Sequence, residues 1–396
     1  MGWLGEKPFH TLLLLTEKPA GWASWKLAWI PLALAVAAGA VWGRVTADAI
    51  LAWAAALSLV LFSLADWTLL TVLPLRGLSF GPVQPPWLGL SLLRWFVSMA
   101  AAPLALCSPL TAIVVLVLLQ ALVWLLMAHG MVVAPFRVQV TQLHAIVDKF
   151  AGVGQPVRIV QISDLHVERL TRRERDLPSM VEKLGPDLIV LTGDFMSTSY
   201  HDDPRSLADL EVVLGRLSAP KGIYAVWGTA EVDLPNLLRP SLEKLGIIVL
   251  ENDAVALEMQ GHSLWLMGLT CSRDLAADGA QLRGLREASP PGMASVLLYH
   301  TPDLMPQAVS LGVDLYLAGH THGGQWRVPG CGAILTSSRY WKRYEAGAYR
   351  DGSTLLYVSR GLGMEGFGTP RARFFCPPEL VQITLLGAPQ GEVAEE

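Results

Sequence analysis

The sequence predicts an α-helical transmembrane region followed by an α/β domain, from its composition, its apolar runs and its strand pattern. Of the 396 residues, 52% are hydrophobic and the mean hydropathy is +0.41, which is too apolar for a purely soluble protein. Charged residues are rare up to about residue 130, and beyond it short apolar runs alternate with amphipathic stretches, as in βα units. The predicted organisation is an N-terminal tail (1–25), a transmembrane region (26–129), a linker with the first strand (130–155), the α/β domain (156–386) and a disordered acidic tail (387–396).

Four apolar runs in the first part predict membrane-spanning helices, because each is close to the length that crosses a bilayer. The third run is the weakest, since it contains Arg94 near one end, where we expect the long side chain to snorkel to the interface. Asp66 could be a functional intramembrane acid, but we expect it to mark the end of the second helix. The four runs are 27–43, 49–65, 87–106 and 109–128.

The basic residues that flank these runs predict the orientation of a multi-pass protein in the cell membrane. With four spans, six Lys and Arg residues share one side and Arg44 stands on the other. The positive-inside rule then places both termini and the α/β domain in the cytoplasm, and the loss of one span would reverse the domain. The six residues are Lys7, Lys18, Lys26, Arg76, Arg137 and Lys149.

Charge and cysteine usage exclude two classes of function. The first 150 residues hold eight Lys/Arg and five Asp/Glu, which leaves 22 basic and 29 acidic residues, a net charge of about −7, for the rest. An acidic domain argues against nucleic acid as a partner. The four cysteines are far apart and form no CxxC spacing, so neither a disulfide framework nor a thiolate zinc site is expected, and a reducing compartment fits.

The α/β part combines buried strands with intervening helices, which indicates stacked sheets flanked by helices. A run at 254–269 alternates about QGH and predicts a hairpin. Strands are expected at 158–163, 187–192, 222–227, 295–300 and 313–318, and helices at 204–217, 236–245 and 303–310.

Asp and His residues follow four of the predicted strands. In open α/β sheets the carboxyl ends of strands form the ligand crevice, so these side chains are expected to converge. A lone buried histidine is more often a core residue than a ligand, but four strand ends in order are hard to ascribe to chance. The candidate ligands are Asp164 and His166, then Asp194, then His300, and then His320 and His322.

Such a set of side chains suits a pair of divalent cations. Two cations about 3.5 to 4 Å apart need a bridging carboxylate and a ring of His and Asp donors, and they activate water and clamp a phosphoryl oxygen. Mixed imidazole and carboxylate ligands favour Mn, Fe or Zn over Ca or Mg.

The order DLH, GD, a glycine turn, a lone His and GHTHGGQ resembles the calcineurin-like metallophosphoesterases, over roughly residues 134 to 386. GHTHGGQ followed by WRVPG, with YVSRGLG at 357–363, resembles the bacterial branch that acts in cell envelopes or at membranes. The resemblance implies an α/β four-layer sandwich of two facing β-sheets with helices outside. It further implies that a metal-bound hydroxide attacks phosphorus in line. Asp164, His166 and His322 would hold the first metal, Asp194 would bridge, and His300 with His320 would hold the second.

The sequence departs from the family in one turn. Where the family has GNHE or GNHD, this chain has Gly228, Thr229, Ala230 and Glu231. The usual Asn binds the second metal and the usual His assists the transition state or protonates the leaving group. Thr229 could offer a hydroxyl, whereas Ala230 can do neither, so the second site is expected to be weakened.

Several functions remain open on this basis. The main interpretation is a membrane-anchored, dinuclear-metal phosphoesterase, either slow or acting on a leaving group that needs no proton. The alternative is a metal-binding sensor or phospho-ligand-binding module with impaired catalysis, and a purely structural domain would need no metal.

Further side chains could bind substrate or membrane. Arg360 follows an apolar strand and could reach a substrate phosphate, although a surface arginine is an equal alternative. His201 could replace the missing proton donor but is more typical of a solvated loop. Arginines at 169–175 and the RYWKRY segment at 339–344 suit a bilayer interface and an amphiphilic, lipid-linked phosphoester, or else a solvated charged loop.

Overall fold

The computed structural model describes residues 18–150, 155–366 and 368–387 and divides into two compact units. An α-helical unit extends to Ala134 and includes Gly366–Ala372, and an α/β unit comprises Pro135–Glu365 and the chain from Arg373 onward. Most of the predicted N-terminal tail and the acidic tail after residue 387 lie outside the described residues.

The helical unit contains four helices that are long and apolar enough to cross a membrane. They span Ser24–Thr46, Ala49–Leu75, Gln84–Leu106 and Pro109–Phe136 with the short turns at their ends. Asp48 caps the second by accepting hydrogen bonds from the backbone N–H groups of Ile50 and Leu51 (2.7 and 3.3 Å). The α-helices are α2 Ser24–Leu27, α3 Trp29–Thr46, α4 Ala49–Leu75, α5 Gln84–Ala101 and α6 Pro109–Val132, with 3₁₀ segments η1 Lys18–Gly21, η2 Ala102–Leu106 and η3 Ala134–Phe136.

A buried ion pair inside this unit corrects two expectations from the sequence. Asp66 does not end the second helix, because α4 continues to Leu75, and Arg94 does not snorkel, because it is fully buried. The Arg94 guanidinium donates two hydrogen bonds to the Asp66 carboxylate, at 2.5 and 2.7 Å. It also donates to the Gln120 side-chain oxygen at 2.9 Å, so α4, α5 and α6 share one polar contact. Charged groups inside a membrane region face the bundle interior and pair with one another, as Arg94 and Asp66 do here.

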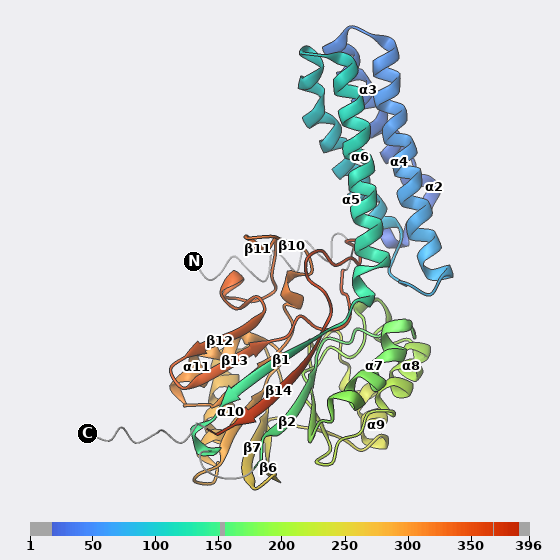
Figure 1. The fold of residues 1–396 in the computed structure, drawn as a ribbon. Helices are drawn as coiled ribbons and strands as arrows, with labels where there is room; N and C mark the ends of the chain where they lie inside the picture. The colour runs from blue at the N-terminus through green and yellow to red at the C-terminus, as the bar shows by residue number, and fades with distance from the viewer. Residues whose placement is uncertain (1–17, 151–154, 367, 388–396) are drawn as a thin grey trace, which may run out of the picture. The chain divides into compact units, whose positions relative to one another are not determined.

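Two six-stranded sheets form the centre of the α/β unit (Figure 1). The first has the order β1-β14-β2-β3-β4-β5 and is parallel from β2 to β5, with β14 antiparallel to β2. The second has the order β12-β13-β9-β8-β7-β6 and is parallel from β13 to β7. The strands are β1 Gln139–Ile146, β2 Val157–Ile162, β3 Leu188–Leu191, β4 Ile223–Ala225, β5 Ile247–Val249, β6 Asp253–Met259, β7 His262–Gly268, β8 Ala294–Leu298, β9 Leu315–Ala318, β10 Arg327–Val328, β11 Gly332–Ala333, β12 Gly347–Asp351, β13 Thr354–Val358 and β14 Glu379–Leu386.

Three apolar clusters show how the layers stack. Ile159 and Val190 of the first sheet pack with Leu266 and Leu317 of the second, so one core lies between the sheets. The next residue along β2, Val160, points to the opposite face and packs with α7, α8 and α9, because side chains alternate along a strand. A third cluster joins the outer face of the second sheet to α10 and α11. The result is the four-layer α/β sandwich that the resemblance implied.

Three of the helices outside the sheets, α7, α8 and α10, begin at side-chain caps, and the sequence-based prediction missed two of these helices, α7 and α10. Thr171 and Glu174 form a capping box at the start of α7, and Gly185 ends this helix in a left-handed conformation. Asp274 caps α10 in the same sense as Asp203 caps α8. The helices are α7 Arg172–Leu184, α8 Pro204–Leu214, α9 Pro235–Lys244, α10 Leu275–Glu287 and α11 Met305–Ser310, with 3₁₀ segments η4 Asp148–Phe150, η5 Thr198–Tyr200, η6 Pro302–Leu304, η7 His322–Gly324 and η8 Trp341–Tyr344.

Candidate dinuclear metal centre

The six candidate ligands meet at the carboxyl ends of four strands. β2 and β3 come from the first sheet, and β8 and β9 come from the second, so both sheets contribute to one site. Their donor atoms form two groups, in each of which all atoms lie within 4.8 Å of one another. The first group is Asp164, His166, Asp194 and His322, and the second is Asp194, His300 and His320.

The first group is fully buried and tightly spaced. His166 Nε2 lies 2.9 Å from His322 Nε2 and 3.5 Å from Asp194 Oδ2. His322 Nε2 lies 3.7 Å from Asp164 Oδ1. Two ring nitrogens that face each other alongside two carboxylates are arranged as donors around a common cation.

The second group shares Asp194 with the first. His300 Nε2 lies 3.3 Å from Asp194 Oδ2, and His320 Nδ1 lies 3.1 Å from His300 Nε2. Thr229 Oγ1 is 3.4 Å from both Asp194 Oδ2 and His300 Nε2. The hydroxyl therefore lies beside the second group.

Backbone carbonyls fix the orientation of two of the rings. His166 Nδ1 lies 3.1 Å from the Met196 carbonyl oxygen, and His300 Nδ1 lies 2.8 Å from that of Thr192. A carbonyl can only accept, so each Nδ1 carries a proton, and Nε2 is the ring atom turned toward the group. Outer hydrogen bonds of this kind orient metal-binding histidines.

The backbone at the site is held in an unusual conformation. Five of the six candidate ligands have positive φ angles between 43° and 69°, a region that non-glycine residues rarely occupy. Such strain concentrates at functional sites, where the surrounding structure over-determines it. The turns also need glycine: a Cβ on Gly228 would lie 2.2 Å from the backbone nitrogen of Asp194. The five residues are Asp164, His166, Asp194, His320 and His322.

Burial and neighbouring charges shift the pKa values of the site residues in opposite directions. Burial raises the pKa of Asp164. Burial would also raise the pKa of Asp194, but His300 and the other imidazoles outweigh it and hold this pKa well below its usual value. For His300, the attraction of Asp194 exceeds the effect of burial and raises the pKa to about 10. Burial, then His300 and Arg273, lower the pKa of His320 to about 3.

These residues fit a pair of divalent cations on three observations. Two buried carboxylates face four imidazoles, His320 is uncharged at neutral pH, and the buried His322 Nδ1 has no hydrogen-bond partner among the described residues. Imidazole and carboxylate donors are those that bind Mn, Fe or Zn. A cation at the second group would have to displace the proton on His300.

One buried carboxylate that sequence reasoning missed organises the divergent turn. Asp233 accepts hydrogen bonds from the backbone N–H groups of Asp194, Phe195 and Gly228, at 2.8, 2.8 and 2.7 Å. Burial, together with the nearby charge of Asp194, raises the pKa of Asp233 to about 7. Ala230 is exposed in the same turn and brings no polar group to the site. The signal in the sequence for Asp233 was its position as an acidic residue shortly after a candidate metal-binding turn.

Two further residues near the first group were also missed. Glu365 Oε2 lies 3.3 Å from His166 Nδ1 and accepts hydrogen bonds from the backbone and hydroxyl of Thr198 (3.0 and 2.9 Å). Arg373 is fully buried and donates to the carbonyl oxygens of Gly361 and Gly363, at 3.1 and 2.5 Å. Glu365 and Arg373 lie in the glycine-rich segment that follows β13. Polar residues in such a segment show no periodic pattern, so the sequence did not identify them.

Arg360 lies at the end of β13 with its guanidinium already engaged. It pairs with the buried Glu379 at 2.8 Å and lies 3.4 Å from the hydroxyl of Thr141. A role in substrate binding therefore remains a prediction and would require this pair to open. His201 Nδ1 lies 2.6 Å from the Thr198 carbonyl oxygen, as expected of an ordinary loop histidine.

Most of the clustered arginines after the first ligand motif are paired. Arg169 pairs with Asp203 at 2.5 Å and stacks over Tyr200, Arg172 pairs with Asp176, and Arg173 pairs with Glu174. Because the Arg173 and Glu174 pair is buried and the others are ion pairs with acidic neighbours, these contacts argue against a lipid-binding cluster. Arg175 makes no ion pair among the described residues.

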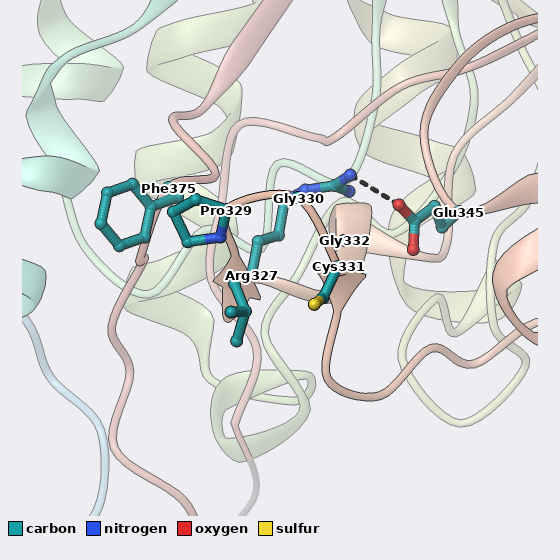
Figure 2. A pocket seen from close by; sticks show the side chains of 8 residues that line it. Arg327, Pro329, Gly330, Cys331, Gly332, Glu345 and Phe375 are labelled. Atoms are coloured by element: carbon teal, nitrogen blue, oxygen red, sulfur yellow. Dashed lines mark hydrogen bonds and ion pairs between the residues drawn. The ribbon is translucent and has the colours of Figure 1, made fainter.

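A separate surface hollow of about 420 Å³ lies at the β10–β11 hairpin (Figure 2). Arg327 and Glu345 form an ion pair of 2.5 Å at its side. Phe375 and Val328 line it and are 70% and 45% exposed. It contains none of the six candidate ligands, and it presents apolar surface to solvent.

Comparison with known proteins agrees with the geometry of the site. A family model described as calcineurin-like phosphoesterase matches residues 157–324. The uncharacterized metallophosphoesterase YkuE of Bacillus subtilis (strain 168) is 32% identical over 237 residues, which are 58% of this chain and 78% of that protein. The phosphodiesterase YaeI of Escherichia coli (strain K12) is 30% identical over 243 residues (60% and 85%). The UDP-2,3-diacylglucosamine pyrophosphatase LpxG of Chlamydia trachomatis is 24% identical over 308 residues (64% and 91%).

The chain is a metallophosphoesterase by fold and site. More specifically, it belongs to the calcineurin-like metallophosphoesterase family, whose members are dinuclear metal-dependent phosphoester hydrolases.

Proposed function

We propose that this protein is a membrane-anchored phosphoesterase that uses two divalent cations, Mn, Fe or Zn, to hydrolyse an amphiphilic, lipid-linked phosphoester. The observation that carries the proposal is the sharing of Asp194 by two groups of buried ligands. A carboxylate between two sets of imidazole and carboxylate donors is the arrangement that a two-metal hydrolase requires.

The residues divide between the two cations by their positions. Asp164, His166 and His322 would hold the first, His300 and His320 would hold the second, and Asp194 would bridge both. Thr229 Oγ1 would complete the second site, where the family has an amide oxygen. The cations would polarise the phosphoryl oxygens and lower the pKa of water, which allows attack at neutral pH.

The surrounding side chains keep the ligands ready for this reaction. Ser163 Oγ and the His320 backbone N–H donate to the Asp164 carboxylate at 2.5 and 2.9 Å, and the Thr229 backbone N–H donates to Asp194 Oδ1 at 2.6 Å. These bonds hold each carboxylate in one orientation, so little reorganisation is needed when phosphate binds. No side chain at position 230 can protonate the leaving group.

Several observations support a lipid-linked substrate at the cell membrane, and the basic residues that flank the four apolar runs support a cytoplasmic placement of the domain. Four helices are long and apolar enough to anchor the chain. Trp341 is 48% exposed beside Lys342 and Arg343, and Phe375 is 70% exposed, a combination suited to a headgroup region. LpxG, a relative, is named for the hydrolysis of a diacylated substrate.

Metal-dependent turnover by the purified full chain tests the proposal. We expect hydrolysis of bis(p-nitrophenyl) phosphate after loading with Mn, Fe or Zn, and its loss in Asp194→Asn, because both cations lose a shared ligand. Asp351→Asn, an exposed position on β12, is the matched control and should retain activity. Failure to turn over any phosphoester with all three metals across the pH range would refute the enzyme.

A second candidate function rests on Ala230. A module that binds metals and phosphorylated molecules without turnover would also keep the six candidate metal-binding residues and lose the proton donor at position 230. In that case Thr229→Asn with Ala230→His should create an activity that the parent lacks. If the parent already hydrolyses the substrate at a rate comparable to that of the double variant, the binding module is excluded.

A further inference from the structure

A pocket beside the second ligand group is lined by two arginines. Its lining includes His300, His320 and Thr229 together with Arg273 and Arg339, whose side chains are exposed. Arg273 comes from the loop between β7 and α10, and Arg339 comes from the loop after β11. Neither loop belongs to the motifs that supply the ligands.

The two arginines differ in their ion pairs with nearby acidic side chains. Arg273 forms a two-pronged ion pair with Glu231, at 3.0 and 2.6 Å, in which both side chains are about half exposed. Within the described residues Arg339 makes no ion pair. The buried Asp303 carboxylate also lines the pocket, but it accepts hydrogen bonds from Ser338 Oγ and the Arg339 backbone N–H, at 2.8 and 3.2 Å.

Ala230 removes the proton donor that the family has in this turn, which favours a leaving group that needs no proton. An alcohol leaves as a strongly basic alkoxide unless a group on the protein protonates it, and Ala230 offers no proton. A phosphate leaves as an anion that is stable at neutral pH, and it needs positive charge rather than a proton. Arginine supplies fixed charge and paired donors that match phosphate oxygens.

We propose that Arg273 and Arg339 bind an anionic phosphate leaving group, so that the substrate is a pyrophosphate diester rather than an ester of an alcohol. This inference rests on the proposed phosphoesterase function and names the class of substrate. Water loses one proton to solvent as its oxygen bonds to the attacked phosphorus. The bond from this phosphorus to the bridging oxygen breaks, and the electron pair remains on the bridging oxygen of the departing phosphate monoester.

Glu231 has a defined part in this arrangement. It occupies the Arg273 guanidinium with the same geometry that a phosphate would use, so the leaving phosphate must displace it. Removal of its charge should therefore improve binding of a pyrophosphate diester. The opposite effects of Glu231→Gln and Arg273→Gln distinguish specific recognition from general damage to the loop.

Kinetics with two substrates test the inference on the full chain in detergent micelles. ADP-ribose is a pyrophosphate diester, and bis(p-nitrophenyl) phosphate releases p-nitrophenolate, which needs neither a proton nor a second phosphate site. Arg273→Gln and Arg339→Gln should each lower kcat/KM for ADP-ribose by about 10- to 100-fold, the usual effect of losing a hydrogen bond to a charged group. The effect on bis(p-nitrophenyl) phosphate should stay below about threefold. Arg350→Gln on β12 is the matched exposed control.

Equal losses on both substrates, or no loss on ADP-ribose in an active protein, would overturn the inference. A binding measurement separates it from the proposed function. Calorimetry on protein of equal metal content should show tighter binding of methylenediphosphonate than of methylphosphonate, a difference reduced by either arginine variant and increased by Glu231→Gln. If this difference in binding appears without turnover, the proposed phosphoesterase activity is refuted, while the proposal that Arg273 and Arg339 bind phosphate is supported. If the parent shows no difference, the site is refuted whatever the turnover.

Discussion

The backbone nitrogen of Asp194 donates a 2.8 Å hydrogen bond to the carboxylate of Asp233. This contact joins the candidate bridging ligand to the turn that departs from the family pattern. The same carboxylate holds Gly228 N at 2.7 Å, so the two turns are fixed against each other by a single side chain. Its effect on the metal centre can be measured directly.

Asp233→Asn should lower both stability and metal content. The amide has one acceptor oxygen in place of two and presents an N–H group to backbone N–H donors, so at least one buried donor is left unsatisfied, at a cost of about 1–3 kcal/mol. Thermal unfolding and metal analysis of the purified chain measure both effects. Asp253→Asn, an exposed change, should leave both at the parental value. An unchanged metal content in Asp233→Asn would show that the turn does not depend on this residue.

Thr229→Ala should weaken the second metal site selectively. The Thr229 hydroxyl lies 3.4 Å from His300 Nε2, which belongs to the second group alone, and 3.4 Å from Asp194 Oδ2, which both groups share. At limiting metal, the metal content per chain should therefore fall from two toward one. Thr270→Ala, in the loop after β7, provides the comparison. Parallel loss of both metals would argue that the hydroxyl supports the whole site rather than one cation.

Arg94→Met should destabilise the helical unit strongly. The change leaves the fully buried Asp66 carboxylate without its partner, and breaking a buried ion pair costs about 3–5 kcal/mol. The double variant Asp66→Leu with Arg94→Met should recover most of the loss, because no buried charge remains. Thermal unfolding in detergent micelles measures this, with the exposed Arg44→Met as control. A single variant as stable as the double would contradict the pairing.

The Arg360 and Glu379 pair should contribute to stability in a pH-dependent way. Burial alone would raise the pKa of Glu379, but Arg360 and the hydroxyl of Thr141 lower it below its ordinary value of 4.5. The contribution is thus present above pH 4.5 and is lost as the pH falls through the lowered pKa of the folded state.

Glu379→Gln should consequently be less stable than the parent at pH 7, and its melting temperature should fall less steeply from pH 5 to about pH 3. The exposed Glu287→Gln should follow the parental curve. Parallel curves for the parent and Glu379→Gln would show that this carboxylate keeps the same pKa on unfolding.

Much of the fold could be predicted because its elements are locally encoded. Apolar runs such as 187–192 and 313–318 correspond to β3 and β9, and the run at 254–269 forms the hairpin of β6 and β7. The helices α7 and α10 were overlooked because both are rich in charged residues, although capping residues mark where they begin. The second apolar helix was predicted to end at Asp66, because an unpaired charge in lipid is costly. The sequence did not show that Arg94 would pair with it.

The sequence by itself determined which side chains follow the strands, and hence that Asp164, Asp194 and His300 lie at one edge of the sheets, because parallel strands bring their carboxyl ends together. It also determined the four apolar helices and the absence of a proton donor at position 230. Only the tertiary structure decided that Arg94 pairs with Asp66, that Asp233 holds Asp194, and that Arg273 lines the pocket beside His320. These contacts join residues 28 to 47 positions apart, and no local periodicity encodes which distant side chains approach when the layers pack.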